Sequence, residues 1–394
     1  MLEVEALVPE AARANGDLHL VAETHWGPEV DLDAGDDDGH VFEARGCARV
    51  EQKRNAGRLN VGQKHRIVNV AERIEVTEAH ALAMDEFGSR HAGDAIGAPT
   101  LPMRDALQMA GEETRTAIFA QPEWLGAVPT HLRLPEGRTL YTGCGTSFHA
   151  AQTGGPALQA LELVLAPEQE ADLLVAVSHE GDTPLTVEAA RAFGGPVWLV
   201  TAKPESPLGE LADEVLVATP EVERSWCHTV SYTCAVATLA ALRGEDVSGL
   251  RAAVTSQLEQ REPVSAHQRF LIAGAGRDWP TAQEAALKLR EGAFVAAEAH
   301  ETEQLLHGHL AAVDESVRAI VLEGEGRAAE RAAGAVRALR ELGCETTLVP
   351  SVHPVVDIVR FQLLTVDLAE ARGVDPDKIR RDDERWNRAR EAYE

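Results

Sequence analysis

Aromatic and basic side chains are scarce in this chain of 394 residues. Phe, Trp and Tyr make up 4% of the sequence, and 37 Lys and Arg stand against 64 Asp and Glu, which gives a formal net charge of −27 at pH 7. Proteins that bind the phosphate backbone of nucleic acid need clustered Lys and Arg, which this sequence lacks. We therefore expect no nucleic-acid partner. Any bound anion must be held by local donors such as hydroxyls and helix N-termini.

The sequence also lacks a cysteine framework and long apolar runs. Its five cysteines are odd in number and scattered, without disulfide or zinc-site spacing. The opening stretch MLEVE has no basic region of a signal peptide. No apolar run approaches the roughly 20 residues that span a bilayer. These absences predict a cytoplasmic protein with no membrane contact.

The first hundred residues differ in pattern from the rest of the chain. They contain an acidic patch at 31–38 and no clear alternation of strands and helices, although 66–70 could form a strand. We expect residues 1–102 to be an N-terminal extension that is weakly ordered, or else a small accessory domain. A stretch upstream of a start at Met103 is the remaining interpretation.

From residue 139 onward, short apolar runs alternate with helical patterns, as in a parallel α/β sheet. The first series predicts strands at 139–142, 173–177, 197–201 and 215–218, with helices at 184–193 and 231–242. A second series predicts strands at 270–273, 317–322 and 346–349, a helix that begins near Pro280, and a helix at 355–371. Both series open with a strand and a glycine turn, which indicates an internal duplication. The sequence therefore predicts two tandem doubly wound parallel modules, 103–252 and 253–394, the second with a helical C-terminal tail.

Two loops of the first module are candidates for anion binding. GCGTS at 143–147 and SHEGDT at 178–183 each follow a predicted strand and lead into a helix. Ligands bind at this edge of open parallel sheets, and hydroxyls beside a helix start can hold a small anion without a lysine. A GxG turn by itself is as often a plain tight turn.

Longer motifs resemble a known family. The two loops are similar to those of the SIS (sugar isomerase) domain. EAALKLRE at 284–291, AEA at 297–299 and LHGHL at 306–310 resemble the isomerase domain of glucosamine-6-phosphate synthases. The resemblance covers about residues 105–376. It implies tandem SIS domains, a homodimer, no cofactor and no metal.

The resemblance also implies roles for individual residues. Glu291 would move a proton between sugar C1 and C2, Lys288 would lie beside it one helical turn earlier, and His307 would open the sugar ring from the partner subunit. The first module would bind the substrate and its phosphate, with contacts expected from Gly145, Thr146, Ser147, Ser178, His179, Glu180, Thr183, His228 and Thr229.

Alternative interpretations of these residues stay open. A Lys–Glu pair on one helix face is often only a surface ion pair. His307 and His309 near several acidic residues invite a metal-site hypothesis, although helical metal sites favour histidines four apart. Cys227 and His228 could suggest a thiol nucleophile, although sequence neighbours rarely face each other.

Three departures from the family pattern limit what the resemblance implies. Leu2 stands where the synthases carry a nucleophilic cysteine, and 1–102 is too short for their glutaminase domain, so we do not expect ammonia transfer from glutamine. Glu180 would repel a neighbouring phosphate unless it points away or is protonated, and it could instead accept hydrogen bonds from hydroxyls or pair with an ammonium. Near the place of the synthases' Schiff-base lysine the tail has Glu384 or Arg385, and Lys378 is out of register.

The favoured function is therefore isomerisation or deamination of a sugar or aminosugar, with a phosphorylated substrate expected. One alternative is a deglycase that cleaves a fructosamine-type adduct, and another is a non-catalytic regulator that binds a sugar phosphate. Retention of both Lys288 and Glu291 favours an enzyme.

Overall fold

The computed structural model describes the side chains and backbone of residues 110–393 and four short strands before them. The chain divides into two compact units, Met1–Ala98 and Pro99–Glu394. In the first unit, the described strands form an antiparallel sheet in the order β1 (Leu2–Glu3), β2 (Leu20–Thr24), β4 (Ala48–Gln52) and β3 (Val41–Ala44). The strand expected at 66–70 and the boundary expected at 102 lie outside the described residues.

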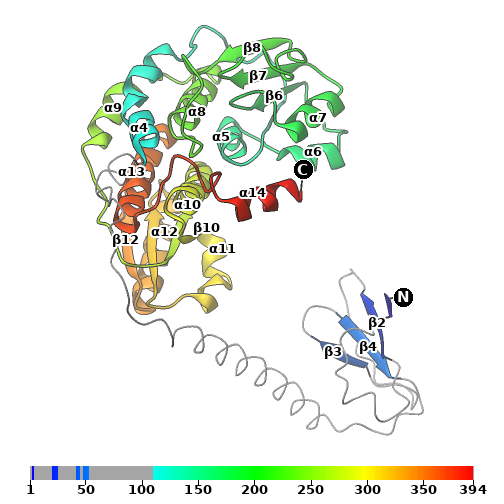
Figure 1. Ribbon diagram of the computed structural model, residues 1–394, viewed down its shortest axis with the longest axis vertical. Coiled ribbons are helices and arrows are strands. Elements are labelled where there is room, and N and C mark those ends of the chain that lie inside the picture. Colours follow the sequence, from blue (N-terminus) through cyan, green and yellow to red (C-terminus); the bar gives the residue numbers. More distant parts are fainter. Residues whose placement is uncertain (1, 4–19, 25–40, 45–47, 53–109, 394) are drawn as a thin grey trace, which may run out of the picture. The chain divides into compact units, whose positions relative to one another are not determined.

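The second unit contains two four-stranded parallel sheets, which confirms the predicted pair of α/β modules (Figure 1). The first sheet has the order β5 (Thr139–Thr142), β6 (Leu173–Val177), β7 (Val197–Thr201) and β8 (Glu214–Val217). The second has the order β10 (Ala296–Glu301), β9 (Arg269–Gly274), β11 (Val317–Leu322) and β12 (Glu345–Val349).

The two sheets share one topology although their strand orders look different. In the second, β10 pairs with β9 on the side opposite β11, so the order reverses at β9. In the first, the short stretch after α5 takes the place of β10. The amide of Tyr141 donates to the carbonyl of Pro156, and Leu158 donates to the carbonyl of Tyr141. Both modules therefore have their switch point after the first strand, between β5 and β6 and between β9 and β11.

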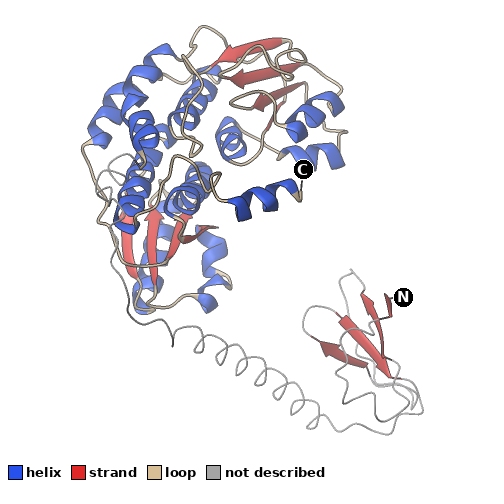
Figure 2. Cartoon of the chain, in the orientation of Figure 1, coloured by secondary structure: helices blue, strands red, loops and turns tan. Residues whose placement is uncertain are grey.

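Helices cover both faces of each sheet (Figure 2). The outer face of the first sheet packs against α6 (Ala160–Leu165) and α7 (Pro184–Ala192), and that of the second against α11 (Thr302–Leu306) and α12 (Arg327–Glu341). The inner faces share one central core with α5 (Thr146–Gly154), α8 (Val230–Leu242), α10 (Trp279–Ala293) and α13 (Pro354–Arg372). Helix α8 is buried along its whole length, which fits its Ala- and Val-rich sequence.

The remaining helices enclose this core and form the end of the chain. Helices α4 (Glu112–Trp124) and α9 (Leu250–Leu258) pack on α8 and α13 respectively. Residue 252, where we expected the module boundary, lies inside α9, and 259–268 without regular structure connects α9 to β9. The C-terminal helix α14 (Glu384–Glu391) is the predicted helical tail.

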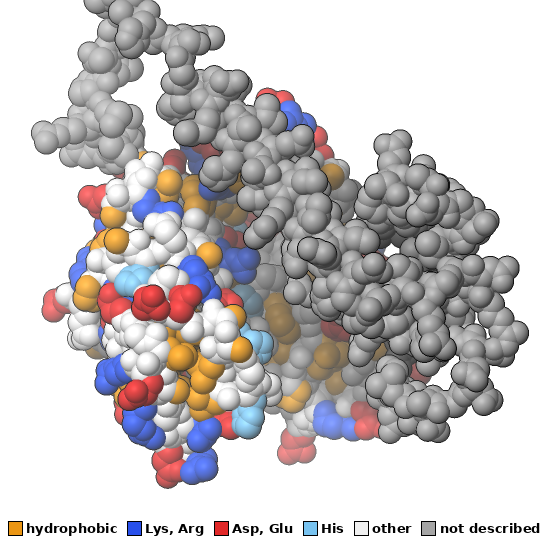
Figure 3. All heavy atoms as spheres, turned by 90° about the horizontal axis from the view of Figure 1, so that it is seen from below, with side chains coloured by type: hydrophobic (Ala, Val, Ile, Leu, Met, Phe, Trp, Pro, Cys, Tyr) orange, Lys and Arg blue, Asp and Glu red, His pale blue; other side chains and the backbone are white. Residues whose placement is uncertain are grey.

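Acidic and basic side chains are interspersed on the face of the described residues seen in Figure 3. Exposed arginines on this unit pair with neighbouring carboxylates, as Arg327 does with Glu330 and Arg331 with Glu303. Such exposed pairs contribute little to stability individually. Among the residues that the structure describes, no helix is both long and apolar enough to cross a bilayer.

Candidate active site

A cavity of about 330 Å³ lies at the switch point of the first sheet. Its walls come from the turn after β5, the loop after β6, the start of α8, Glu291 of α10 and the segment before α14. Seven of the predicted site residues line it: Thr146, Ser147, His179, Glu180, Thr183, His228 and Glu291. Parallel α/β sheets bind ligands at this position, because the loops diverge there and leave a crevice.

Glycine shapes the turn that leads from β5 into α5. A Cβ on Gly143 would lie 2.8 Å from the carbonyl carbon of Ser147, so only glycine lets the chain turn back this closely. Gly145, the N-cap of α5, has φ of 54°, which also favours glycine. The turn therefore brings the hydroxyls of Thr146 and Ser147 to the cavity at the start of a helix.

The loop after β6 brings a second group of polar side chains to the cavity. Ser178 is buried, its hydroxyl accepts a hydrogen bond from the amide of Gly181 at 3.2 Å, and it lies 3.3 Å from the hydroxyl of Thr183. Ser178 therefore shapes the loop, and Thr183 faces the cavity. Glu180 also lines the cavity, and its carboxylate lies 4.0 Å from the ammonium of Lys203.

Two histidines and a tryptophan line the cavity from the loop after β6 and the segment before α8. The Nε2 atom of His179 accepts a hydrogen bond from the amide of Glu223, which leaves the proton on Nδ1. The rings of His179 and His228 meet edge to face at 5.3 Å, and Trp226 meets His228 at 6.3 Å. Burial lowers the pKa of His228 to about 4, despite the nearby carboxylate of Glu223. The imidazole of His228 is therefore neutral at pH 7.

Thr229 does not line the cavity. Its amide and hydroxyl both donate to one carboxylate oxygen of Glu223, at 2.7 and 2.9 Å, and Ser231 donates twice to the other, at 2.9 and 2.6 Å. This buried carboxylate satisfies N–H groups at the start of α8, which otherwise lack partners. Thr229 thus holds the wall of the cavity in place.

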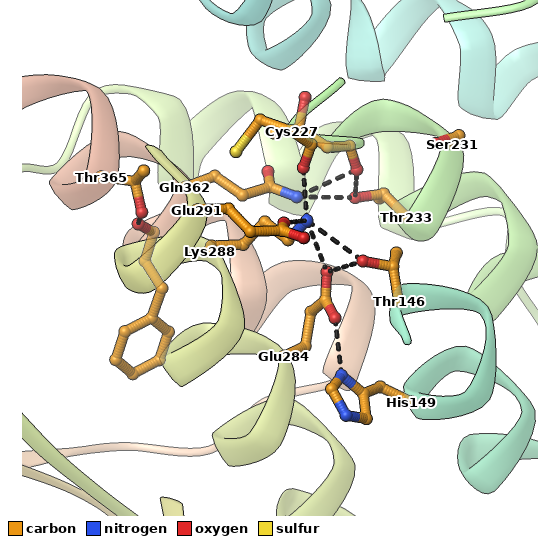
Figure 4. A network of polar contacts seen from close by, with 12 residues as sticks. Thr146, His149, Cys227, Ser231, Thr233, Glu284, Lys288, Glu291, Gln362 and Thr365 are labelled. Carbon is orange, nitrogen blue, oxygen red and sulfur yellow. Dashed lines mark hydrogen bonds and ion pairs between the residues drawn. The ribbon is translucent and has the colours of Figure 1, made fainter. Parts of the chain in front are cut away.

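Helix α10 carries three charged residues on one face, spaced by four and three positions (Figure 4). Lys288 is fully buried, with its Nζ 3.3 Å from Glu284 and 2.8 Å from Glu291. The same Nζ donates to the hydroxyl of Thr146 at 3.1 Å and to the carbonyl of Cys227. Glu284 accepts hydrogen bonds from Thr146 and from Nδ1 of His149. Lys288 therefore lies beneath the cavity wall, and Glu291 is the member of the group that faces the cavity.

Burial and charge act on this group in opposite directions. Burial alone would lower the pKa of Lys288, but the carboxylates of Glu284 and Glu291 outweigh it, and the pKa is raised. Burial raises the pKa of Glu291, and Lys288 opposes that rise. A carboxylate with a raised pKa, fixed by a permanent cation and facing a cavity, is suited to general-base catalysis.

The other candidate chemistries find less support in the described part of the chain. Burial raises the pKa of the Cys227 thiol to about 12, which makes it a poor nucleophile. His307 directly follows α11 on the outer side of the second sheet. Its side chain is 72% exposed, and its Nε2 is 2.8 Å from a carboxylate oxygen of Glu303. His300 and His309 stack at 4.4 Å, yet no group of three or more potential ligands is gathered for a metal within the described residues.

The sequence analysis missed several site residues, of which four bear on the chemistry of the site. Glu284 and His149 belong to the buried network, and Asp182 and Arg381 line the cavity. The spacing of Glu284 four positions before Lys288 was visible in the sequence and could have indicated the pair. Arg381 reaches the cavity from the tail, with its guanidinium 3.8 Å from the Trp226 ring centre, a contact that no local pattern encodes.

Known proteins are similar in sequence to the chain that carries this site. The chain is 26% identical over 308 residues to the glutamine–fructose-6-phosphate aminotransferase (isomerizing) of Zymomonas mobilis, a match of 62% of this chain and 51% of that protein. It is 31% identical over 300 residues to the protein of that name from Symbiobacterium thermophilum, covering 60% of this chain and 49% of that protein. The chain thus spans about half the length of the curated relatives it matches.

Solved structures show the same fold. The C-terminal domain of glucosamine-fructose-6-phosphate aminotransferase from Francisella tularensis superposes with a TM-score of 0.59 at 20% identity, over 68% of this chain and 99% of that one. A glucosamine-6-phosphate deaminase from Thermotoga maritima gives 0.56 at 20% identity, over 68% and 97%. The sequence pattern of the SIS domain matches residues 134–243 and 264–372, one stretch in each module. The chain therefore belongs to the SIS domain family and carries two SIS domains in tandem.

Proposed function

We propose that the chain binds an open-chain sugar phosphate and moves a proton between its C1 and C2, as a phosphosugar isomerase or aminosugar-phosphate deaminase. The observation that carries this proposal is the position of Glu291. Glu291 lines the same cavity as Ser147 and Thr183, and Lys288 holds its carboxylate at 2.8 Å. A phosphate held by those hydroxyls and the start of α5 would leave the sugar carbons to extend toward α10.

In this proposal Glu291 is the catalytic residue and Lys288 positions it. A single carboxylate can take the proton from one sugar carbon and return it to the neighbouring carbon. Lys288 already has four acceptors around its Nζ, more than its three N–H bonds can serve, so it keeps Glu291 in one orientation. The neutral imidazole of His228 lies on the same cavity and is available to donate to or accept from a sugar hydroxyl.

An amine on the substrate is favoured by the acidic residues that line the cavity. Glu180 and Asp182 both lie there, on the loop that would otherwise hold only the phosphate. An ammonium on the sugar would pair with these carboxylates, whereas a neutral ketose would leave them facing the phosphate. The same observation supports the second candidate, a deglycase that acts on a fructosamine-type adduct.

A homodimer belongs to the proposal because ring opening needs an acid–base group near the sugar. The resemblance assigns that role to His307, and within one chain His307 is exposed and paired with Glu303. We propose that a second copy of the chain brings its His307 to the cavity described here.

Solvent-deuterium exchange tests the proposal. The wild type is incubated with glucosamine 6-phosphate or fructose 6-phosphate in D₂O, and deuterium at C1 and C2 is followed by NMR. We expect exchange with at least one of these sugars and a loss of about 10²–10⁴-fold in Glu291→Gln, the usual contribution of a general base. If both sugars bind and neither exchanges in the wild type, the regulator becomes the better interpretation. Equal exchange in wild type and variant would remove Glu291 from the mechanism.

A further inference from the structure

A second cavity, of about 430 Å³, lies in the same unit on the opposite side of the α5–α10 contact. Gly276, Arg277 and Pro280 line it from the second module, together with His353 at the start of α13. The end of α5 and the end of α8 complete it from the first module. Its volume lies within the range of about 300–1,000 Å³ that is typical of small-molecule sites.

The turn that lines this cavity repeats the turn of the first site. A Cβ on Gly274 would lie 2.7 Å from the carbonyl oxygen of Asp278, just as a Cβ on Gly143 would meet the backbone of Ser147. Gly276 has φ of 59°, close to the 54° of Gly145. Both turns follow the first strand of their module at its switch point, so the second cavity occupies the position at which the first module holds its candidate site.

Each cavity is also lined in part by a helix that belongs to the other module. The first takes Glu291 from α10, a helix of the second module. The second takes Gln152 and Thr153 from α5, a helix of the first module. The internal duplication therefore reproduces the glycine turn and the wall taken from the other module, although no residue of the loop after β11 lines the second cavity.

The guanidinium donors at the second cavity favour an anion. Arg243 and Arg277 line it together with a single carboxylate, Glu245, which is paired with Arg243 and lies 3.5 Å from His353. Arg277 donates through Nη2 to Glu325 and to the carbonyl of Val352, which leaves the N–H groups on Nε and Nη1 without a partner among the described residues. Glu245 and Glu325 offset the charge of the two arginines, so what the cavity offers an anion is the remaining N–H donors of Arg277.

We propose that this second cavity binds a phosphate-bearing small molecule, with Arg277 as its principal contact. The guanidinium takes the place that the hydroxyl of Thr146 holds in the first turn, and its planar donors match two phosphate oxygens. The first cavity has hydroxyls and carboxylates around Glu291, whereas the two groups of the second that could act as a base, Glu245 and His353, lie against each other, and Glu245 is also paired with Arg243. The second cavity is therefore a binding site without chemistry of its own.

Calorimetric titration of the full chain with inorganic pyrophosphate tests this proposal. Arg277→Met should weaken binding at the second cavity at least tenfold, whereas Arg277→Lys should recover most of it. The matched control is Arg327→Met, an exposed arginine of the same module that pairs with Glu330 and lines neither of the two cavities. It should bind as the wild type does. Ser147→Ala, which alters only the first cavity, should leave the Arg277-dependent binding unchanged.

A variant that retains both arginines gives an independent test. Glu245→Gln removes the one carboxylate among the lining residues, and it should tighten pyrophosphate binding by about threefold or more. The proposal is overturned if the wild type shows no binding that depends on Arg277, or if Arg277→Met and Arg327→Met bind equally. Should Arg277→Met not fold, weaker or unchanged binding in Glu245→Gln overturns the proposal by itself. Because these measurements do not involve Glu291, they are independent of the proposed activity.

Discussion

The ammonium of Lys288 lies 2.8 Å from the carboxylate of Glu291, and the pair joins a fully buried cation to a carboxylate that lines a cavity. Glu284 contacts the same ammonium from the other side at 3.3 Å. One cation thus serves two carboxylates, so that the charge on either acid changes the proton affinity of the other.

The first prediction follows from the contact of one ammonium, that of Lys288, with both carboxylates. The carboxylate of Glu284 is one of the groups that raise the pKa of Glu291. Glu284→Gln should therefore lower the pKa of Glu291 and move the acidic limb of the pH profile of kcat/KM to lower pH. Lys288→Met should move that limb to higher pH. A profile unchanged in both variants would show that a group other than Glu291 controls the acidic limb.

The second prediction concerns the phosphate. Ser147 lines the first cavity at the start of α5, so Ser147→Ala should weaken binding of a phosphosugar by roughly 1–3 kcal/mol, as expected for a hydrogen bond to a charged group. An unphosphorylated analogue should be much less affected. Ser256→Ala, an exposed serine of α9, is the control. Equal losses for the two ligands would place the phosphate elsewhere.

The third prediction concerns Glu223. Burial opposes the charge of this carboxylate, but His228 and the hydrogen bonds from Ser231 and Thr229 outweigh it, so the pKa of Glu223 is lowered. Its stabilising effect is present above the pKa of an unfolded glutamate, about 4.3, and is lost as pH falls through the lower folded value. Glu223→Gln should cost about 2–4 kcal/mol at pH 7, because backbone and hydroxyl donors at the start of α8 lose a charged acceptor. Urea unfolding at pH 7 and pH 3 measures this, and the cost should shrink at the lower pH.

The fourth prediction has the opposite dependence on pH. Burial and the neighbouring Asp278 raise the pKa of Asp357 to about 7, against the hydrogen bond from the amide of Val352. For a carboxyl with a raised pKa, stability is full below the unfolded value and is lost as pH rises through the folded one. Wild-type stability should therefore decline between about pH 4 and pH 7 by about 2–4 kcal/mol from this group. Asp357→Asn keeps an acceptor for Val352 and should be more stable than wild type at pH 8 but not at pH 5, as melting temperatures would show.

Most of the predicted strands are short apolar runs, and β6 and β11 are buried along their whole length, so the sequence predicted them well. The strand expected at 173–177 matches β6, and the one expected at 346–349 differs from β12 by one residue. It did not predict β10, whose sequence AAEAHE has neither β-branched residues nor alternation. This edge strand forms because β9 offers it a full parallel ladder. A propensity argument cannot anticipate a partner of that kind.

The site residues show the same difference between what local motifs predict and what contacts distant in sequence decide. Thr146, Ser147 and Glu291 each belong to a motif within one turn or one helix, so the sequence could indicate them, and all three line the first cavity. Arg381 was not predicted, because its backbone is placed by contacts distant in sequence. The amide of Trp226 donates to the carbonyl of Asp377, whose carboxylate accepts from Thr114. His307 stays a prediction for a similar reason, since its proposed neighbours belong to another chain.

The contact between α5 and α10 also bears on how far the two modules depend on each other. Each helix begins at the glycine turn of its own module and ends on the wall of the cavity that belongs to the other. Separation of the two modules would leave each with half a cavity and an exposed apolar helix face. Each module is therefore a structural part of the other's cavity, and a chain that lost either module would lose the enclosure of both cavities.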